Sequence, residues 1–580
     1  MGRNISGPVF TVPSQALSNA NSPGEALPQA VDNERLLRIE QMIQYCIKNH
    51  SKCNKISLSF MPTRLLNITD ASKIYLQVAP ANTRPYTCLS HRWANWDLAG
   101  PPVALTKGSY DSFTNHISFE SLPATFQDAI KVSMVLNFQY VWIDSLCIIQ
   151  DDDKDKSREI SQMSSVYSNA SLTIAANNVR DNRLPFVTGR ETHPSREAHK
   201  FSVSDNQGRS YEVYARETVP HSHWWGKCYP EWFMQDTQSR EERTSTLFER
   251  AWVFQERLLS PRVLNFEHSE LVLECRENTV CECRQTSHLE ISMPLEISDC
   301  MHPKEKFAYL LDRCGADKRK FSIVWRKLIY DYSQLSLTMG TDKLPAVSGI
   351  AQEMHQRCPE MKYVAGMWQH SILEDLLWHV NRELETLPME RSKWRAPTWS
   401  WASCDAFVFW LYTQLEGESF LGHHVESLRA RVLEISCQPK TTHEFGEIQP
   451  GACIYLEAQV APVTVLVSSG KPACVEIAGY ATYQKGVSIQ ISLDRKSSGD
   501  CEVKLQCLRV LTMRYDESDA EDRSLTGLVE NCLLLRCVDI ASQTYERVGE
   551  LRFRIPIDDK RTVAIPGPVF DEKFQKVRII

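Results

Sequence analysis

The sequence lacks the features that would place it in a membrane or on a nucleic acid. No apolar run approaches the roughly 18 residues that a membrane-spanning helix requires, and the N-terminus has no apolar signal-peptide segment. The formal net charge is -7 and no cluster of Lys and Arg stands out, although a nucleic-acid surface needs such clusters. We therefore expect a soluble, cytoplasmic protein with no transmembrane segment and no nucleic-acid partner.

The common catalytic and repeat motifs are also absent. The sequence has no Gly-rich phosphate loop, no GxSxG elbow, no HExxH pair and no protein-kinase motifs. It has no tandem repeats of the kind that build propellers or ankyrin arrays. Any activity must therefore depend on residues that the fold brings together.

Cysteine is abundant, with 19 residues in the chain, but the cysteines are scattered singly through apolar stretches. In a large protein without a secretory signal, such residues are expected to be reduced and mostly buried. An odd number also fits poorly with a complete disulfide framework. We therefore expect buried thiols and no disulfide scaffold.

Two groups of potential metal ligands occur in the sequence. Cys46, His50 and Cys53 place three zinc-type ligands close together, but a structural zinc site needs four, and no fourth ligand lies nearby in the sequence. The segment from Cys275 through Cys281 to Cys283 does not have the spacing of a zinc knuckle. We therefore predict no metal site. Cys46 is expected in the core, His50 and Cys53 where a helix ends, and the second group of cysteines in the core or in a strand.

The length of 580 residues exceeds the size at which one hydrophobic core keeps growing, so two or three domains are expected. A tail over residues 1–32 is rich in Pro, Ser, Asn and Gly and is predicted to be disordered. An N-terminal domain is predicted over 33–285, with its core motifs in 86–266. A helical region over 286–420 follows, and short alternating runs predict a β-rich accessory domain over 421–580.

Within the N-terminal domain, strand-like apolar runs alternate with helix-length amphipathic segments, which is typical of α/β units around a largely parallel sheet. The expected strands lie near 86–90, 140–144, 171–176 and 262–266, and the expected helices near 123–136, 157–168 and 249–259. A short antiparallel pair is expected over 62–68 and 73–78. Parallel sheets place functional groups at the carboxyl ends of their strands, where Asp144 and Cys147 would lie.

The same region resembles the fungal heterokaryon incompatibility (HET) domain. The resemblance rests on LPATFQDAI (122–130), YVWIDSLCIIQD (140–151) and EISQMSSVYSNASLTIAA (159–176), with YTCLSHRW (86–93) upstream and RAWVFQERLLSPRVL (250–264) downstream. Further on, TDKLPA (341–346) and PTWSWAS (397–403) resemble segments that are usual in full-length members, so the resemblance covers about residues 40 to 410. It implies a role in non-self recognition and programmed cell death when incompatible fungal cells fuse, with an unknown partner protein and self-association as a further expectation.

A second resemblance is to Toll/interleukin-receptor (TIR) domains. Ser90, at the end of a strand and followed by His91 and Arg92, is similar to the first conserved box of those domains, and the strand ending at Asp144 is similar to their second. In TIR domains that cleave NAD, a helix carries a Trp and, four residues later, the catalytic Glu. Trp252 and Glu256 have this spacing, which puts both on one helix face. The resemblance implies a TIR-like or flavodoxin-like, mostly parallel sheet flanked by helices.

The TIR resemblance also implies roles for individual residues. Glu256 would be the catalytic residue, binding the ribose of NAD and stabilising the sugar cation that forms when the nicotinamide bond breaks. Glu159 is the alternative acid, although capping of a helix N-terminus explains the acidic residues around it. NAD would be a substrate, and no bound cofactor is predicted. The residues implied in nucleotide binding are Ser90, His91, Arg92, Trp93, Asp144 and Trp252.

Two functional readings remain open from the sequence. In the first, the domain is an NAD glycohydrolase that the rest of the chain restrains. In the second, it is a non-catalytic module that oligomerises and recruits death-pathway proteins, and Glu256 is an ordinary surface residue or pairs with Arg250 or Arg257. Convergence of Glu256, Trp252, Asp144 and Trp93 on one site would favour the first reading.

Overall fold

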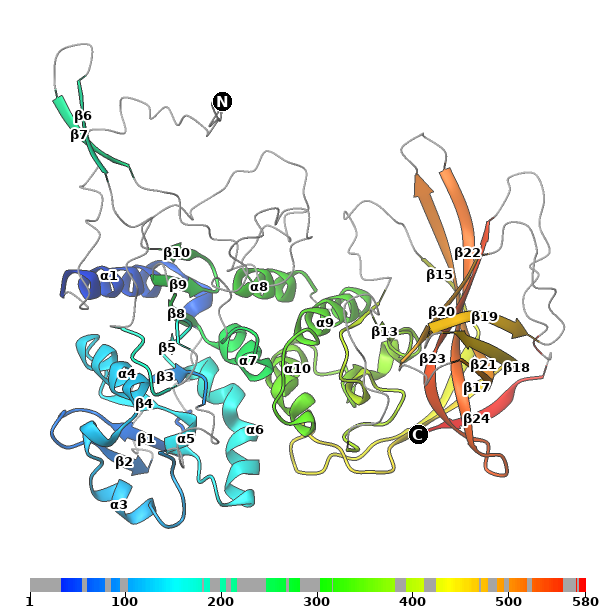
Figure 1. Cartoon of the computed structure of the whole chain (residues 1–580), viewed down its shortest axis with the longest axis horizontal. Coiled ribbons are helices and arrows are strands. Elements are labelled where there is room, and N and C mark those ends of the chain that lie inside the picture. Colours follow the sequence, from blue (N-terminus) through cyan, green and yellow to red (C-terminus); the bar gives the residue numbers. More distant parts are fainter. Residues whose placement is uncertain are drawn as a thin grey trace.

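The computed structural model describes most of the chain. The described residues are 33–54, 60–78, 85–93, 103–179, 182–187, 199–204, 210–215, 247–267, 271–281, 303–314, 317–380, 393–410, 424–468, 471–477, 488–494, 500–518, 524–556, 570 and 573–580. The predicted disordered tail and Cys283 lie outside them. Three regions follow one another in Figure 1: an α/β region, a helical region and a β-rich region.

The α/β region is built on an eight-stranded sheet with the order β10-β9-β8-β5-β3-β4-β1-β2. Its strands are β1 (Arg64–Asn67), β2 (Tyr75–Val78), β3 (Thr87–Ser90), β4 (Tyr140–Trp142), β5 (Leu172–Ala175), β8 (Arg262–Phe266), β9 (Leu271–Cys275) and β10 (Thr279–Cys281). The four strands expected from the sequence are β3, β4, β5 and β8, and each is buried along its whole length. Burial on both faces explains why apolar residues in these strands are not confined to alternate positions.

The four central strands are parallel. Cys88 on β3 pairs with Trp142 on β4 and with Thr173 on β5, and β5 is parallel to β8. The expectation of a mostly parallel sheet is wrong for the sheet as a whole, which is mixed. The expected β1–β2 pair adds antiparallel strands next to β4, and β9 and β10 add them beyond β8. The short connections of these outer strands allow antiparallel pairing, whereas a parallel partner would need a long crossover.

Helices cover both faces of this sheet. Figure 1 shows α4 (Ala124–Val135) on one side, and α6 (Asp153–Asn169) and α7 (Ala251–Leu259) on the other. The α6 helix begins earlier than expected because Asp152 accepts hydrogen bonds from the backbone amides of Lys154 and Asp155. The region also contains α1 (Asn33–Asn49) and two short helices, α3 (Tyr110–Asn115) and α5 (Asp144–Cys147). A hairpin pairs β6 (His199–Ser204) with β7 (Ser210–Ala215).

The helical region lies between the sheet of the α/β region and the β-rich region (Figure 1). It contains α8 (Pro303–Cys314), α9 (Lys318–Tyr332), α10 (Pro345–Arg357) and α11 (Ile372–Asp375), with the two-stranded pairs β11 (Tyr363–Val364) with β12 (Met367–Trp368) and β13 (His379–Val380) with β14 (Val408–Phe409). Gly349 on α10 allows a close approach to α6 and α7, because an added Cβ would lie 2.5 Å from Ser164 Cβ and 2.8 Å from Gln255 Oε1. The α10 helix therefore packs directly against both helices.

The C-terminal region is a ten-stranded sheet, as expected from the alternating runs. Its strands are β15 (His424–Leu428), β16 (Ala430–Ser436), β17 (Cys453–Ala458), β18 (Val460–Ser468), β19 (Lys471–Ile477), β20 (Ser488–Leu493), β21 (Cys501–Ser518), β22 (Ser524–Asp539), β23 (Thr544–Pro556) and β24 (Gln575–Ile579). Between the described strands of this sheet, all pairs are antiparallel except a short parallel contact between β23 and β24.

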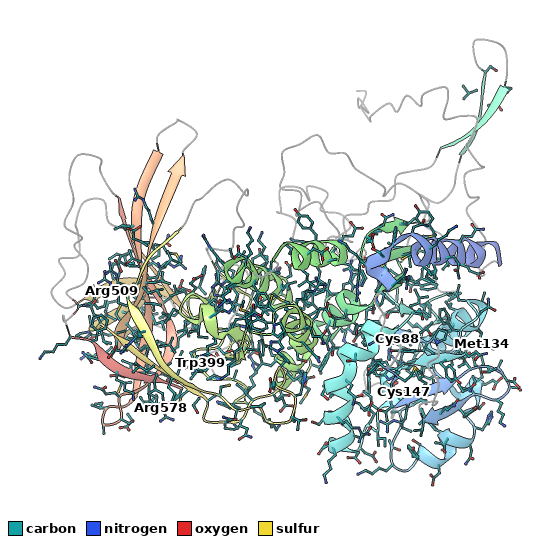
Figure 2. All side chains as sticks on the ribbon, turned by 180° about the vertical axis from the view of Figure 1, so that it is seen from behind. Cys88, Met134, Cys147, Trp399, Arg509 and Arg578 are labelled. Carbon is teal, nitrogen blue, oxygen red and sulfur yellow. The ribbon has the colours of Figure 1, made fainter. Side chains whose placement is uncertain are left out.

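Two large hydrophobic cores hold the chain together. The core of the α/β region includes Cys88 and Cys147, which are fully buried (Figure 2). The other core runs from Leu258 on α7 through the helical region, including buried Trp399, to Leu533 on β22. The helix α7 therefore connects the α/β region to the rest of the molecule. Within the described part of the chain, no helix is both long and apolar enough to cross a membrane.

Candidate functional site

The strongest candidate site lies at the carboxyl end of β3. Ser90 is the last residue of this strand, and its Oγ donates a hydrogen bond of 2.5 Å to Oε2 of Glu256 on α7. Residues 166 positions apart are thus joined. The side chain of Glu256 faces the sheet rather than bulk solvent, with the residue 8% exposed.

Burial governs the electrostatics of Glu256. Desolvation raises its pKa to about 7, and the nearby charge of Asp144 acts in the same direction. The hydroxyls of Ser90 and Tyr167 and the positive charge of Arg250 oppose this shift. The carboxyl group of Glu256 therefore gains and loses its proton near neutral pH, which is the range that suits a catalytic acid or base.

The loop after β3 lies beside the end of β4. The indole Nε1 of Trp93 donates a hydrogen bond of 2.8 Å to Oδ2 of Asp144, and Nδ1 of His91 lies 3.8 Å from Oδ1 of the same carboxylate. Asp144 follows β4 directly, at the start of α5. The ends of β3 and β4 thus bring three of the implied nucleotide-binding residues together.

His91 is buried and neutral. Burial lowers its pKa, the neighbouring Asp144 only partly offsets this, and its ring packs edge-on against Phe126 at 5.0 Å. Its Nε2 has no hydrogen-bond partner among the residues that the structure describes. A buried polar atom of this kind is uncommon and requires an explanation, of which a ligand is one.

Arg250 joins this loop to α7. It lies immediately before the helix, and its Nη1 donates to the backbone carbonyl of His91 at 2.8 Å. The side chain of Arg92, by contrast, is exposed. Arg250 thus brings a positive charge to the site. The sequence indicated Arg250 only as a possible ion-pair partner of Glu256, and the implied set of binding residues contains Arg92 in its place.

The indole of Trp252 is bound to the helical region. Its Nε1 donates a hydrogen bond of 3.0 Å to Oδ2 of Asp342, in the 3-10 helix η9 (Gly340–Lys343). The ring is partly buried and packs against both large hydrophobic cores. Trp252 therefore anchors α7 to the helical region. Its Nε1 takes no part in the hydrogen bonds at the ends of β3 and β4, which involve Ser90, Glu256, Trp93 and Asp144.

Comparison with protein families matches residues 86–256 to the model described as heterokaryon incompatibility protein (HET). Residues 86–256 are a HET domain. Its limits fall just before β3 and at Glu256, so the domain contains Ser90, Asp144 and Glu256. The HET domain implies a role in heterokaryon incompatibility, the non-self recognition that leads to fungal cell death. No curated protein and no solved structure matches the chain.

Glu159, the alternative acid, lies elsewhere in the HET domain among charged partners. It is 2% exposed, and its Oε1 lies 3.5 Å from Arg64 Nη2 and 3.1 Å from Arg158 Nε. Arg64 also pairs with Asp155 at 2.5 Å and donates to the carbonyl of Cys147 at 2.7 Å. The ion pairs tie β1 to α6 and the hydrogen bond to Cys147 ties it to α5, which gives Glu159 a structural explanation.

Cys147 is buried inside the HET domain, and burial raises the pKa of its thiol to about 12. A reactive cysteine needs a lowered pKa and access to solvent. Cys147 is therefore a core residue, as expected from the sequence.

A second cluster lies outside the HET domain. Cys275 supplies the fourth potential ligand that the sequence around Cys46, His50 and Cys53 lacks, and the ligand atoms of all four residues lie within 4.8 Å of one another. The expectation that no fourth ligand is near these three residues is wrong in three dimensions, because α1 packs beside β9. No local spacing could have revealed this, since His50 and Cys275 are 225 positions apart.

Proposed function

We propose that the HET domain of this chain cleaves NAD at its nicotinamide bond, with Glu256 as the catalytic residue, and that this reaction drives the death response. The observation that carries the proposal is the buried Glu256, with a pKa of about 7, hydrogen-bonded to Ser90 at the carboxyl end of β3. NAD-cleaving TIR domains have their catalytic Glu on a helix of similar pattern.

The strand order supports this proposal. The four parallel strands have the order β4-β3-β5-β8, so the chain goes from β3 to one neighbour and then crosses to the other. This is the order in which flavodoxin-like sheets begin, and such sheets bind ligands at the carboxyl ends of the strands where the direction reverses. The reversal occurs at β3, whose last residue is Ser90.

The proposed reaction is a hydrolysis that yields ADP-ribose and nicotinamide. The bond between ribose C1′ and the pyridinium nitrogen breaks, its electron pair goes to that nitrogen, and neutral nicotinamide leaves. The ionised carboxylate of Glu256 stabilises the cationic sugar. Water then adds to C1′, and its proton passes to Glu256 and on to solvent. A pKa of about 7 suits Glu256 to both roles, because both its ionised and its protonated forms are populated near neutral pH.

Other residues of the site have supporting roles in this proposal. Asp144 holds the indole of Trp93, whose ring offers a stacking surface for the nicotinamide or adenine base. The buried Nε2 atom of His91 has no partner among the described residues, and a polar group of the substrate would satisfy it. Trp252 acts by position, because its bond to Asp342 fixes the helix that carries Glu256.

One observation favours the non-catalytic alternative. Glu256 already has hydrogen-bond partners in Ser90 and Tyr167, so it also resembles a satisfied core residue. In that case the HET domain acts by self-association and by recruiting other death-pathway proteins. Glu256 then only stabilises the contact between α7 and the sheet.

The deciding experiment compares the purified full chain with its Glu256→Gln variant. The parent protein incubated with NAD is expected to release free nicotinamide, and Glu256→Gln should reduce the rate roughly 10²-fold or more. Glu120→Gln is the matched control, because Glu120 is an exposed acid of the same domain, on η3 (Phe119–Ser121). Nicotinamide is quantified by chromatography and the fold of each variant by circular dichroism.

Expression at a high level in a fungal host tests the link to cell death. The parent chain should slow growth or kill, and Glu256→Gln should abolish this at equal protein abundance. If Glu256→Gln remains fully toxic and the parent releases no nicotinamide, the hydrolase proposal is wrong. The non-catalytic alternative then predicts that changes which block self-association abolish the killing.

A further inference from the structure

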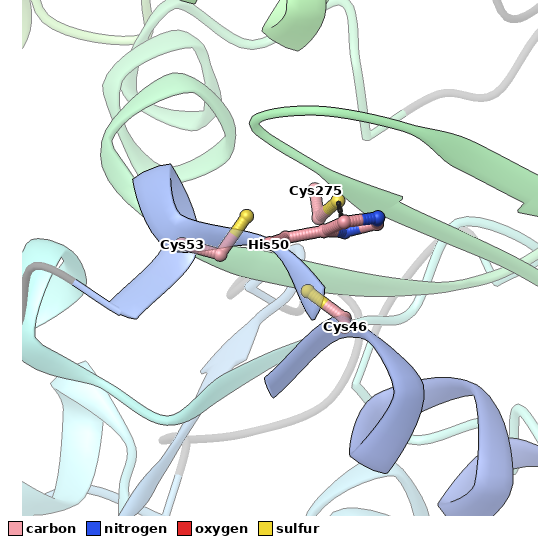
Figure 3. Close-up of side chains that lie close together, drawn as sticks. All are labelled: Cys46, His50, Cys53 and Cys275. Atoms are coloured by element: carbon pink, nitrogen blue, oxygen red, sulfur yellow. Dashed lines mark hydrogen bonds between the residues drawn. The ribbon is translucent and has the colours of Figure 1, made fainter. Parts of the chain in front are cut away.

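Three cysteines and one histidine gather where the N-terminal helix meets the edge of the α/β sheet. Cys46 lies in the last turn of α1, His50 follows the helix, Cys53 lies in η2 (Ser51–Asn54), and Cys275 ends β9. Figure 3 shows the three sulfur atoms and the imidazole ring directed toward one another. The three cysteines are buried and His50 is half-buried.

The ligand set is that of a structural zinc site. Three thiolates and one imidazole form one of the common tetrahedral sets for Zn²⁺, whereas Mg²⁺ and Ca²⁺ prefer oxygen ligands. Around a zinc ion with Zn–S bonds of about 2.3 Å, neighbouring ligand atoms lie about 3.5–3.8 Å apart. Here all ligand atoms lie within 4.8 Å of one another, and His50 Nδ1 lies 3.3 Å from Cys275 Sγ. Small side-chain movements would therefore complete a tetrahedron.

Groups around the cluster are suited to stabilise thiolates. Arg262 Nε lies 3.2 Å from Cys46 Sγ, and the backbone amide of Asn278 donates to Cys275 Sγ at 3.2 Å. Zn²⁺ with three thiolates carries one net negative charge, which the guanidinium of Arg262 offsets. Donors of this kind orient metal ligands and adjust their charge in established metal sites.

We propose that Cys46, His50, Cys53 and Cys275 bind one Zn²⁺ ion as a structural site. The ligands come from both sides of the HET domain in sequence, so the metal fastens the segment that enters the domain to the segment that leaves it. Because these ligands come together only in the folded chain, the free energy of zinc binding would add to the stability of the fold.

Contacts beside the ligands join the same two segments. The backbone amide of Lys52 donates to Glu277 Oε1 at 2.6 Å, and Arg276 Nη1 donates to the carbonyl of Lys52 at 3.2 Å. Arg276 Nη2 also donates to the carbonyl of Leu259 at the end of α7. Through Arg276, a metal at this site would steady the helix that carries Glu256.

Metal content of the purified full chain tests the proposal directly. Protein purified under reducing conditions without a metal-affinity tag should contain close to one zinc per chain by elemental mass spectrometry. Replacement of zinc by Co²⁺ should give the visible absorption of a tetrahedral thiolate site. Cys275→Ser should lose the metal, whereas Cys537→Ser, at an exposed free cysteine of the β-rich region, should keep it.

His50 provides a variant that does not depend on a buried cysteine. His50→Cys supplies a fourth thiolate and should keep the zinc, whereas His50→Ala should weaken binding measurably in competition with a chelator. Chelation should lower the thermal stability of the parent but not of Cys275→Ser. Absence of zinc in the parent together with no binding of added Zn²⁺ would overturn the proposal, as would a disulfide between two of the three cysteines in freshly isolated protein.

Discussion

Glu159 on α6 and Glu256 on α7 are both buried in the HET domain, but their surroundings differ in charge. Glu159 lies among the guanidinium groups of Arg64 and Arg158. Glu256 is bound to the neutral hydroxyls of Ser90 and Tyr167, and burial raises its pKa to about 7. A buried acid with a close cation is explained by structure, whereas a buried acid kept near its ionisation point is a candidate for chemistry.

The largest predicted effect is a loss of stability when the ion pairs around Glu159 are broken. Arg64→Ala removes the buried member of the two cations that Asp155 and Glu159 share and leaves only the half-exposed Arg158, so it should lower the free energy of unfolding by about 3–5 kcal/mol. Denaturant titration of the full chain, monitored by circular dichroism, measures this loss. Arg431→Ala is the control, because its ion pair with Glu457 is exposed and should contribute about 0–1 kcal/mol. Equal losses in both variants would contradict the structural account of Glu159.

The next effect is the contribution of Glu256 to the pH dependence of stability. Its pKa rises from 4.5 to about 7 on folding, so the folded state keeps the proton that the unfolded state has already lost. Retention of this proton contributes ~3 kcal/mol to the free energy of unfolding. The contribution is fully present below pH 4.5, declines as the pH rises, and is lost above about pH 7. Glu256→Gln should remove this part of the pH dependence.

Thermal unfolding of the parent and Glu256→Gln across this pH range measures the difference. Relative to the parent, the variant should gain stability as the pH rises from 4.5 to 7.5. Parallel profiles for the two proteins would show that Glu256 is not the group that titrates.

A smaller effect is expected where α10 packs against both α6 and α7. Gly349→Ala would place a Cβ 2.5 Å from Ser164 Cβ and 2.8 Å from Gln255 Oε1, so the helices must move apart. Overpacking of this kind costs about 1–3 kcal/mol. If the helical region positions α7, nicotinamide release should also fall. Ala351→Gly, on the same helix, is a control that lowers helix propensity without adding volume.

Much of the α/β region could be predicted from the sequence, because apolar runs and helical periodicity are local properties. The central strands β3, β4, β5 and β8 and the helices α4, α6 and α7 occur where these patterns indicated. The antiparallel pair β1–β2 at one edge was predicted, whereas the antiparallel direction of β9 and β10 at the other edge was not, because a short apolar run looks the same in either orientation. The sheet is therefore mixed, not mostly parallel.

Long-range pairing could be predicted only where a family resemblance supplied it. The TIR resemblance placed Ser90 and Glu256 in one site, and in the structure a hydrogen bond connects their side chains. The TIR resemblance also selected Trp252, four residues before Glu256, but it did not predict the hydrogen-bond partner of Trp252. That partner, Asp342, lies in the helical region. No family resemblance placed Cys275 near His50, so the sequence alone could not predict that the two residues are close in the fold.

The smallest and most specific effect concerns the bond between Ser90 and Glu256. Ser90→Ala removes a hydroxyl that favours the ionised form of Glu256, so the pKa of Glu256 should rise further. If ionised Glu256 stabilises the sugar cation, the midpoint of the pH–rate profile for nicotinamide release should move up by about one pH unit. Ser145→Ala is the matched control, because Ser145 is also buried beside a strand end, and its Oγ has no partner among the described residues. A shift in both variants would point to general loosening of the HET domain, whereas a shift in Ser90→Ala alone would tie the titrating group to Glu256, since this hydroxyl contacts that carboxylate directly.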